Sequence, residues 1–226
     1  MARKDDIRSA YKKLGGSASI YDGMMTCTTV LGTAISRAVW GIGPEMNAAY
    51  IESATSGIPE GFAGSLLEVP VGTGVLTMPL YDTLEDAQVT CLDYSPDMMA
   101  SAQQKASILG LHNVTFKQGD VDALPFDDES FDTVLSMNGF HAFPNKEAAY
   151  AETYRVLKPG GTFCGCFYVE GEKARTDWLI KHFYVPKGFF TPPFETRESL
   201  EHRLCGLYSS AQVECFNSMA CFTCVK

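Results

Sequence analysis

The sequence has few basic residues for its acidic content. It contains 18 Lys and Arg against 27 Asp and Glu in 226 residues, which gives a formal net charge of −9. Proteins that bind nucleic acids usually carry a basic face, because much of their affinity comes from neutralising phosphates. No cluster of Lys and Arg offsets the acidity here. We therefore expect a small-molecule partner and no nucleic acid.

Long apolar runs are also missing. No stretch approaches the roughly 20 apolar residues that a membrane-spanning helix needs, so we expect no integral membrane association. The segment Met1–Asp6 is not followed by the apolar region of a secretory signal. On this basis we expect a cytoplasmic protein.

Cysteine is present, but its pattern does not indicate a disulfide framework. Most of the eight cysteines lie in apolar, strand-like segments, where a free cysteine behaves as a small hydrophobe in a reducing compartment. Cys164, Cys166, Cys221 and Cys224 raise the alternative of a metal site. Residues 221 and 224 of one strand point to opposite faces, which is poor geometry for zinc. We therefore expect no metal.

From residue 65 onward, strand and helix signals alternate. This alternation predicts an α/β protein with a mainly parallel sheet, closed by an antiparallel hairpin around Asn217-Ser218. Strands are expected at 66–69, 87–92, 113–118, 131–137, 162–169, 212–216 and 219–225, and helices at 75–83, 95–109, 146–157, 177–184 and 197–204.

Two segments lack this alternation. Residues 1–60 have helical signals without strands, and 171–196 is rich in Pro, Gly and aromatic residues. We expect a helical N-terminal cap or lid at 1–60 and a main domain at 61–226, with a lid inserted at 171–196. Ligand sites are often built on insertions over the edge of a sheet. The following aromatic residues either line an apolar pocket there or belong to the core: Phe183, Tyr184, Phe189, Phe190 and Phe194.

One glycine turn and two carboxylates together indicate a nucleoside ligand. Gly72 and Gly74 follow the first expected strand, where missing Cβ atoms let a polar ligand approach backbone N–H groups. Asp93 ends the second strand and can accept hydrogen bonds from ribose hydroxyls. Asp120 follows the third strand, where an adenine amino group can be read. Each residue alone has a purely structural explanation, but their meeting at one sheet edge favours a binding site.

These segments resemble the motifs of class I S-adenosylmethionine-dependent methyltransferases, in the small-molecule branch that includes ubiquinone/menaquinone C-methyltransferases. The resemblance implies a Rossmann-like, seven-stranded, mostly parallel sheet with a C-terminal antiparallel hairpin and a helical N-terminal cap. It also implies S-adenosyl-L-methionine as cofactor and methyl transfer to a small molecule, on an O, N, S or C atom that the sequence does not identify. The matching segments are Glu68–Gly74, Leu92–Met99, Gly119–Phe126, Ser130–Val134 and Arg155–Thr162.

The resemblance further assigns cofactor-binding positions. Pro70 stands where the family usually has Gly, and because proline has no N–H, one backbone contact to the cofactor is lost. The positions implied are Glu68, Val69, Pro70, Gly72, Thr73, Gly74, Asp93, Tyr94, Met98, Asp120, Val121, Asp122 and Asn138.

Two residues are candidates for catalysis. His141 follows the fourth strand near the expected methyl group and is a candidate general base, which is needed only if the acceptor must lose a proton. It is alternatively a loop histidine packed beside Phe140 and Phe143. Tyr21 is the second candidate, because N-terminal segments often cap the cofactor in this family, and its alternative role is an aromatic anchor for the N-terminal helices.

Two other functions stay open. One is a regulator that binds S-adenosylmethionine without catalysis, although the presence of Gly72 and Asp93 does not favour it. The other is an NAD(P)-dependent oxidoreductase, whose Gly-x-Gly-x-x-Gly fingerprint would need glycine where this chain has Thr77. The sequence leaves open whether the chain forms a homodimer.

Overall fold

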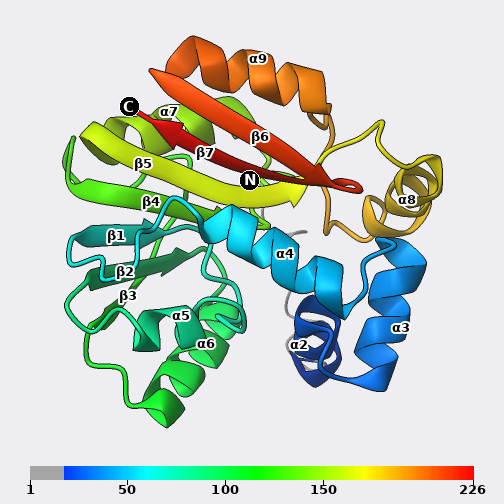
Figure 1. Cartoon of the computed structure of the whole chain (residues 1–226), viewed down its shortest axis with the longest axis horizontal. Coiled ribbons are helices and arrows are strands. Elements are labelled where there is room, and N and C mark those ends of the chain that lie inside the picture. The colour runs from blue at the N-terminus through cyan, green and yellow to red at the C-terminus, as the bar shows by residue number, and fades with distance from the viewer. Residues whose placement is uncertain (1–17) are drawn as a thin grey trace.

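A computed structural model describes residues 18–226, which form a seven-stranded sheet flanked by helices (Figure 1). The strand order is β3-β2-β1-β4-β5-β7-β6. The first five strands pair in parallel, and β7 runs antiparallel to both β5 and β6. The expected sheet and closing hairpin are therefore confirmed. The strands are β1 (Ser65–Glu68), β2 (Gln88–Asp93), β3 (Val114–Gln118), β4 (Phe131–Met137), β5 (Leu157–Tyr168), β6 (Ser210–Phe216) and β7 (Met219–Val225).

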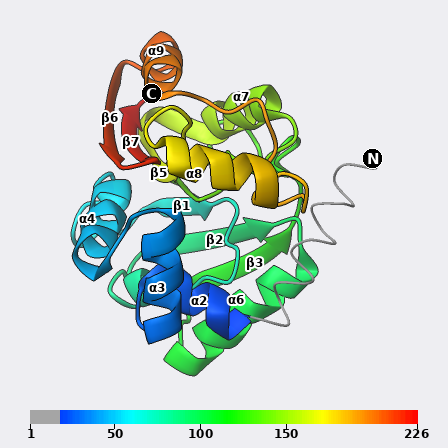
Figure 2. The same ribbon diagram turned by 90° about the vertical axis from the view of Figure 1, so that its right-hand side faces the viewer.

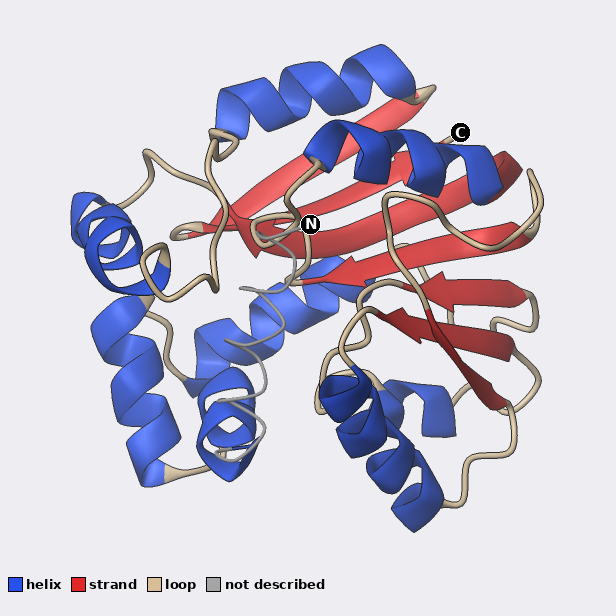
Figure 3. Cartoon of the chain, turned by 180° about the vertical axis from the view of Figure 1, so that it is seen from behind, coloured by secondary structure: helices blue, strands red, loops and turns tan. Residues whose placement is uncertain are grey.

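Helices lie on both faces of the sheet (Figure 3), and each face buries its own apolar cluster. Tyr50 of α4, Tyr81 of α5 and Ala102 of α6 belong to one cluster. Tyr150 of α7 and Leu200 of α9 belong to the other. The helices are α2 (Ala18–Thr26), α3 (Val30–Val39), α4 (Pro44–Thr55), α5 (Met78–Asp82), α6 (Pro96–Leu109), α7 (Lys146–Val156), α8 (Ala174–Leu179), the π-helix η1 (Ile180–Tyr184) and α9 (Arg197–Leu207).

Capping residues account for the start and end of α6. The Ser95 hydroxyl accepts a hydrogen bond from the backbone N–H of Met98, and Pro96 occupies the first turn. Gly110 ends the helix with φ 71°, a left-handed conformation that glycine adopts without a Cβ penalty. These signals place α6 directly after the carboxyl end of β2, so the start of the helix lies beside Asp93.

Helices α2, α3 and α8 gather at one end of the sheet (Figures 1 and 2). Cys27, with φ 52°, lies in the turn between α2 and α3. The hydroxyl of Thr29 caps α3 by accepting a hydrogen bond from the backbone N–H of Gly32. A Cβ on Gly32 would lie 2.1 Å from the carbonyl oxygen of Gly23. Gly32 therefore permits close contact between the two helices and does not interrupt either of them.

The expected cap at 1–60 falls partly on residues 1–17, which lie outside the described part of the chain. Within the described residues, α4 packs against β5 and β7, with Tyr50 and Ala54 in the core. Helices α2 and α3 instead lie with α8, where the Thr176 hydroxyl donates to the carbonyl of Val39 at 2.8 Å. The division into a cap and a main domain stays a prediction.

Several element boundaries differ from expectation: α8 begins at Ala174 and not at 177, α9 extends to Leu207 and β6 begins at Ser210. Strand β5 begins at Leu157 and not at 162, because Leu157 pairs with Phe131 before the register shifts. Helix α5 begins at Met78 and not at 75, because the residues after the glycine turn make separate turns.

Some residues of the matching segments lie at the opposite edge of the sheet, where the parallel strands begin. Lys158 at the start of β5 bonds Asp132 at 2.8 Å, and the backbone N–H and hydroxyl of Ser65 both donate to the other carboxylate oxygen of Asp132. The Lys158 hydrogen bond, together with those of Ser65, lowers the pKa of Asp132 to about 2. These residues join the beginnings of β1, β4 and β5, away from the edge where Asp93 lies.

Within residues 18–226, no helix is long and apolar enough to cross a membrane. The eight cysteines are free thiols. Cys221 and Cys224 contribute to the two different apolar clusters, as expected for residues on opposite faces of one strand.

Candidate functional site

Asp93 connects the end of β2 to the glycine turn after β1. Its Oδ2 accepts a hydrogen bond from the backbone N–H of Gly72 at 2.8 Å, and its Oδ1 accepts from the N–H of Ser95 at 2.8 Å. The side chain is only 6% exposed. Burial raises the pKa of Asp93 to about 6, although backbone hydrogen bonds from Ser95, Gly72 and Tyr94 act in the opposite direction. The carboxylate is thus fixed in place.

A cavity of about 100 Å³ opens beside Asp93, and we call it the rim cavity. It brings together the ends of β1, β2, β3 and β4, as expected for the carboxyl edge of a parallel sheet. Nine of the predicted cofactor-binding residues line it: Val69, Pro70, Gly72, Asp93, Tyr94, Met98, Asp120, Val121 and Asn138.

The two glycines of the turn have different roles. Gly72 has φ 57°, and a Cβ placed on it would meet no atom within 4 Å, so its backbone is open toward the rim cavity. Gly74 has φ 67°, and its Cβ would lie 2.9 Å from Met78 and 3.1 Å from Ala102. Gly74 therefore allows α6 to pack against the turn.

The other predicted cofactor residues support this edge from outside the rim cavity. Glu68 is buried, and its Oε2 accepts bonds from the hydroxyls of Thr77 and Tyr81 and from the thiol of Cys91. Burial raises the pKa of Glu68 to about 8. Thr73 donates to Asp22 on α2. Asp122 likewise does not line the cavity, and its backbone N–H donates to the carboxylate of Asp120.

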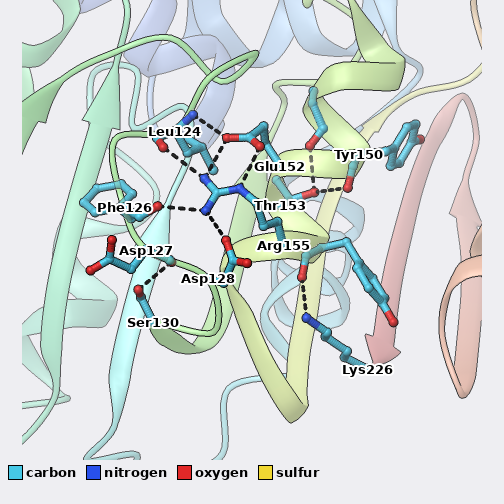
Figure 4. Close-up of polar contacts among 12 residues, drawn as sticks. Leu124, Phe126, Asp127, Asp128, Ser130, Tyr150, Glu152, Thr153, Arg155 and Lys226 are labelled. Atoms are coloured by element: carbon cyan, nitrogen blue, oxygen red, sulfur yellow. Dashed lines mark hydrogen bonds and ion pairs between the residues drawn. The ribbon is translucent and has the colours of Figure 1, made fainter.

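Arg155 holds the segment that carries Asp120. Its guanidinium donates to the carbonyls of Leu124 and Phe126 and to the carboxylates of Asp128 and Glu152, at 2.7–3.0 Å (Figure 4). Glu152 also accepts from the backbone N–H of Leu124 at 2.7 Å. The Arg155–Thr162 motif thus contributes to the site indirectly, because Arg155 fixes the loop after β3.

A second cavity, of about 300 Å³, lies under α2, α3 and η1, and we call it the lid cavity. Its lining is mainly aromatic and apolar. Four of the five expected lid aromatics line the cavity, and the fifth, Phe194, packs against Phe190. The polar residues of its lining are Tyr21, Ser36, Asn47, Tyr50, Asn138, His141, Tyr184 and Lys187. The aromatic residues include Trp40, Phe183, Tyr184, Phe189 and Phe190.

Tyr21 and Asn138 line both cavities and mark where they meet. Tyr21 lies on α2, and burial, followed by the charges of Asp22 and Asp93, raises the pKa of its phenol. Asn138 follows β4 with φ 57°. A non-glycine residue in this conformation is often held at a functional site by its surroundings.

His141 lies at the wall of the lid cavity and is 6% exposed. Its Nδ1 accepts a hydrogen bond from the backbone N–H of Tyr168 at 3.3 Å. Its ring stacks on Phe190, with centroids 4.0 Å apart and planes inclined by 13°. Burial, with a contribution from the charge of Lys146, lowers the pKa of His141 to about 3.

Other residues of the rim cavity did not emerge from sequence reasoning as cofactor-binding positions. Ser95 and Gly119 belong to the segments Leu92–Met99 and Gly119–Phe126, but the resemblance does not assign them to the cofactor. Phe143 and Pro144 lie two and three residues after His141, so the position of this loop after β4 is the sequence signal that points to them. The full set is Leu92, Ser95, Gly119, Met137, Ala142, Phe143 and Pro144.

Comparison with known proteins identifies the central part of the chain. Residues 66–161 match the family model described as a methyltransferase domain. Over 96 residues the chain is 43% identical to demethylmenaquinone methyltransferase of Thermus thermophilus, a match that covers 42% of this chain and 43% of that protein. Over 118 residues it is 32% identical to 2-methyl-6-phytyl-1,4-hydroquinone methyltransferase 2 of Oryza sativa subsp. japonica, covering 52% and 32% of the two chains.

The chain thus spans less than half the length of these two relatives. An S-adenosylmethionine-dependent methyltransferase from Thermotoga maritima is similar in structure, with a TM-score of 0.68 at 17% sequence identity. That similarity covers 96% of this chain and 99% of the other, and at this identity it shows a shared fold. The chain therefore shares the fold of an S-adenosylmethionine-dependent methyltransferase, and its residues 66–161 match the model of a methyltransferase domain.

Proposed function

We propose that this chain transfers a methyl group from S-adenosylmethionine to a small-molecule acceptor held in the lid cavity. The observation that carries the proposal is the meeting of two cavities at Tyr21 and Asn138. One cavity has the polar groups that a nucleoside needs, and the other is mainly apolar. A transfer reaction requires two such sites side by side, because most of its acceleration comes from holding the two reactants together.

The rim cavity fits the nucleoside part of the cofactor. A carboxylate offers about four acceptor positions, and the bonds from Gly72 and Ser95 occupy two of those on Asp93. The remaining acceptor capacity of this carboxylate is proposed to bind the hydroxyls of a ribose. Asp120 lies on the same cavity, on the loop that Arg155 fixes, and is the group proposed to face the adenine. When bound, the cofactor supplies the electrophilic methyl group.

The chain's own residues position the acceptor and exclude water. Tyr21 and Asn138 lie where the acceptor must meet the cofactor, and α2 covers this junction. The raised pKa of Tyr21 keeps its phenol protonated, so it is a hydrogen-bond donor at neutral pH. Sequestration from water strengthens the polar contacts made there.

The acceptor is proposed to have an apolar, ring-sized body. Trp40, Tyr184 and Phe190 form a wall of contacting rings on the lid cavity, with centroids 5.5–6.3 Å apart. Aromatic walls of this kind favour aromatic or other flat apolar ligands. The names of the two relatives given above refer to a demethylmenaquinone and a hydroquinone, which supports a ring-shaped acceptor.

The cellular setting is also a proposal. The thiols are free, and most of them are buried in the apolar clusters, which supports a reducing, cytoplasmic compartment. The acidic sequence supports a small-molecule partner in preference to a nucleic acid. A homodimer is neither required nor opposed by the site, and sedimentation analysis of the purified chain tests it.

The first test is calorimetric titration with S-adenosylhomocysteine. We expect binding by the wild type and a loss of about tenfold or more in Asp93→Ala, because two charge-assisted hydrogen bonds are removed. Glu85→Gln, an exposed substitution after α5, is the control. Absence of binding at millimolar ligand would contradict the proposal.

The second test separates an enzyme from a protein that only binds the cofactor. Labelled S-adenosylmethionine is incubated with the protein and fractionated cell extract. We expect label in an apolar small-molecule fraction, and a strong decrease with Ser36→Phe, which fills the lid cavity. Cofactor binding without any labelled product would favour the regulator instead.

A further inference from the structure

The two nitrogens of His141 have different surroundings. The backbone N–H of Tyr168 donates to Nδ1 at 3.3 Å, so Nδ1 must carry a lone pair and no proton. In a neutral imidazole the proton then resides on Nε2. Among the residues that the structure describes, none makes a hydrogen bond to Nε2. His141 lines the lid cavity, and with Nδ1 engaged, Nε2–H is the polar group that it can offer to a ligand.

The surroundings of the ring oppose a positive charge. Phe190 stacks on it, and the Lys146 ammonium lies nearby, held by the carbonyls of Phe143 and Thr191. The other titratable groups around the lid cavity are the phenols of Tyr21, Tyr50 and Tyr184 and the ammonium of Lys187. No carboxylate is among the described lining residues, so nothing there would stabilise an imidazolium.

A base at Nε2 would need a different arrangement. For Nε2 to accept a proton, the neutral ring must carry its own proton on Nδ1, and the product is an imidazolium cation. The proton on Nδ1 would then face the N–H of Tyr168, donor against donor. The hydrogen bond observed between Tyr168 and His141 therefore favours the donor tautomer.

We propose that His141 is a neutral Nε2–H donor that selects acceptors carrying an oxygen lone pair, such as a carbonyl, phenol or enolate oxygen, and that it does not remove a proton. This inference rests on the proposed function, since it describes the acceptor side of the same site. A ligand without such an oxygen leaves a buried donor unpaired, which costs binding. His141 then sets which ring-sized molecules stay in the lid cavity.

A matched pair of probes tests the selection. 1-Tetralone and tetralin have the same shape, but only the ketone offers an oxygen lone pair. With S-adenosylhomocysteine present, we expect the wild type to bind 1-tetralone about tenfold more tightly than tetralin. Equal affinity for the two probes would overturn the proposal.

Two substitutions separate the nitrogens. His141→Asn retains an oxygen near the position of Nδ1, to accept from Tyr168, and removes the Nε2 donor. His141→Gln retains a donor near Nε2 and loses the contact with Tyr168. We expect the ketone preference to vanish in the Asn variant and to persist in part in the Gln variant. His182 is an exposed residue of η1 that does not line the cavity, so His182→Asn should leave the ketone preference unchanged. A ketone preference that persists in His141→Asn and vanishes in His141→Gln would contradict the donor role.

Nitrogen NMR of the wild-type protein tests the tautomer without any variant. We expect His141 to show a protonated Nε2 and an unprotonated Nδ1, with no titration between pH 5 and 9. A cation forming near pH 6, or a proton on Nδ1, would overturn the inference. These readouts are independent of methyl transfer. Failure to bind S-adenosylhomocysteine would remove the proposed function, while the NMR result would still decide the state of His141.

Discussion

The hydroxyl of Thr73 donates a hydrogen bond to Oδ1 of Asp22 across 2.7 Å and so joins helix α2 to the glycine turn. The other carboxylate oxygen of Asp22 pairs with Lys105 of α6 at 2.9 Å. Tyr21, the neighbour of Asp22, lines both cavities. The two contacts of Asp22 therefore fix the helix that covers their junction.

Removing these contacts should speed ligand release. We expect Asp22→Ala to increase the dissociation rate of S-adenosylhomocysteine about tenfold, because a hydrogen bond and an ion pair are both lost. Thr73→Val keeps the ion pair with Lys105, so an increase of about threefold is expected. Stopped-flow displacement measures both rates. Glu85→Ala, at an exposed position after α5, is the control. Wild-type rates in both test variants would show that α2 does not restrain the ligand.

Cofactor affinity should depend on the ionisation of Asp93. Burial raises the pKa of this carboxyl to about 6, and ribose hydroxyls donate better to the ionised form than to the protonated one. Affinity should therefore rise with pH through about 6 and become constant above it. We expect binding at pH 5 to be about tenfold weaker than at pH 7, measured by calorimetry with S-adenosylhomocysteine.

Asp93→Asn provides the control for that pH dependence. The amide cannot titrate, so its weaker binding should be nearly the same at pH 5 and pH 7. Circular dichroism at both pH values checks that the fold is retained. A wild-type affinity that stays flat across this range would mean that Asp93 does not hold the ribose in its ionised form.

Local chemistry made part of the site predictable from sequence. Parallel strands end at one edge, so Gly72, Asp93 and Asp120 were expected to meet, and all three line the rim cavity. The helix expected at 95–109 is likewise observed as α6, which begins after the cap Ser95 and ends at Gly110. Where a residue's role follows from its position along its own strand or helix, the sequence was sufficient.

Roles that depend on direction or on distant contacts could not be predicted in this way. Glu68 belongs to the motif, but the alternation of β1 turns its side chain toward Tyr81 and Cys91 and away from the cavity. The partner of Thr73 is 51 residues away, on α2. His141 was a candidate base because it follows β4. Its hydrogen bond with the backbone N–H of Tyr168, which determines which nitrogen carries the proton, depends on a residue 27 positions away and cannot be seen in the sequence.

The buried carboxyl of Glu68 should make stability depend on pH. Burial raises its pKa from 4.5 to about 8, so between these values the folded state keeps a proton that the unfolded state has lost. The free energy of unfolding should therefore fall as pH rises from about 4.5 to 8 and then become constant. Glu68→Gln is neutral at every pH and lacks this dependence.

We expect Glu68→Gln and the wild type to have similar stability near pH 5. At pH 8.5 the variant should be more stable by on the order of 3 kcal/mol, measured by urea unfolding. Glu85→Gln serves as the exposed control and should show no such difference. If the difference between Glu68→Gln and the wild type does not change with pH, then Glu68 is ionised in the folded protein and its three donors outweigh burial.

The contact between α2 and α3 should tolerate no added atom at Gly32. Its Cβ would lie 2.1 Å from the backbone oxygen of Gly23, so Gly32→Ala must push the helices apart. Overpacking of this kind costs about 1–3 kcal/mol. Gly206→Ala is the matched control, because no atom lies within 4 Å of a Cβ at this exposed helical position. Alanine there should stabilise the protein by about 0.5 kcal/mol.

Hydrogen exchange locates the effect of Gly32→Ala. Because α2 covers the junction of the two cavities, its displacement should increase exchange in residues 18–39 and weaken binding of S-adenosylhomocysteine, while β1 to β7 stay protected. Gly206→Ala should change neither exchange in 18–39 nor binding. If Gly32→Ala lowered global stability but left binding intact, the position of α2 would matter for folding and not for the site beneath it.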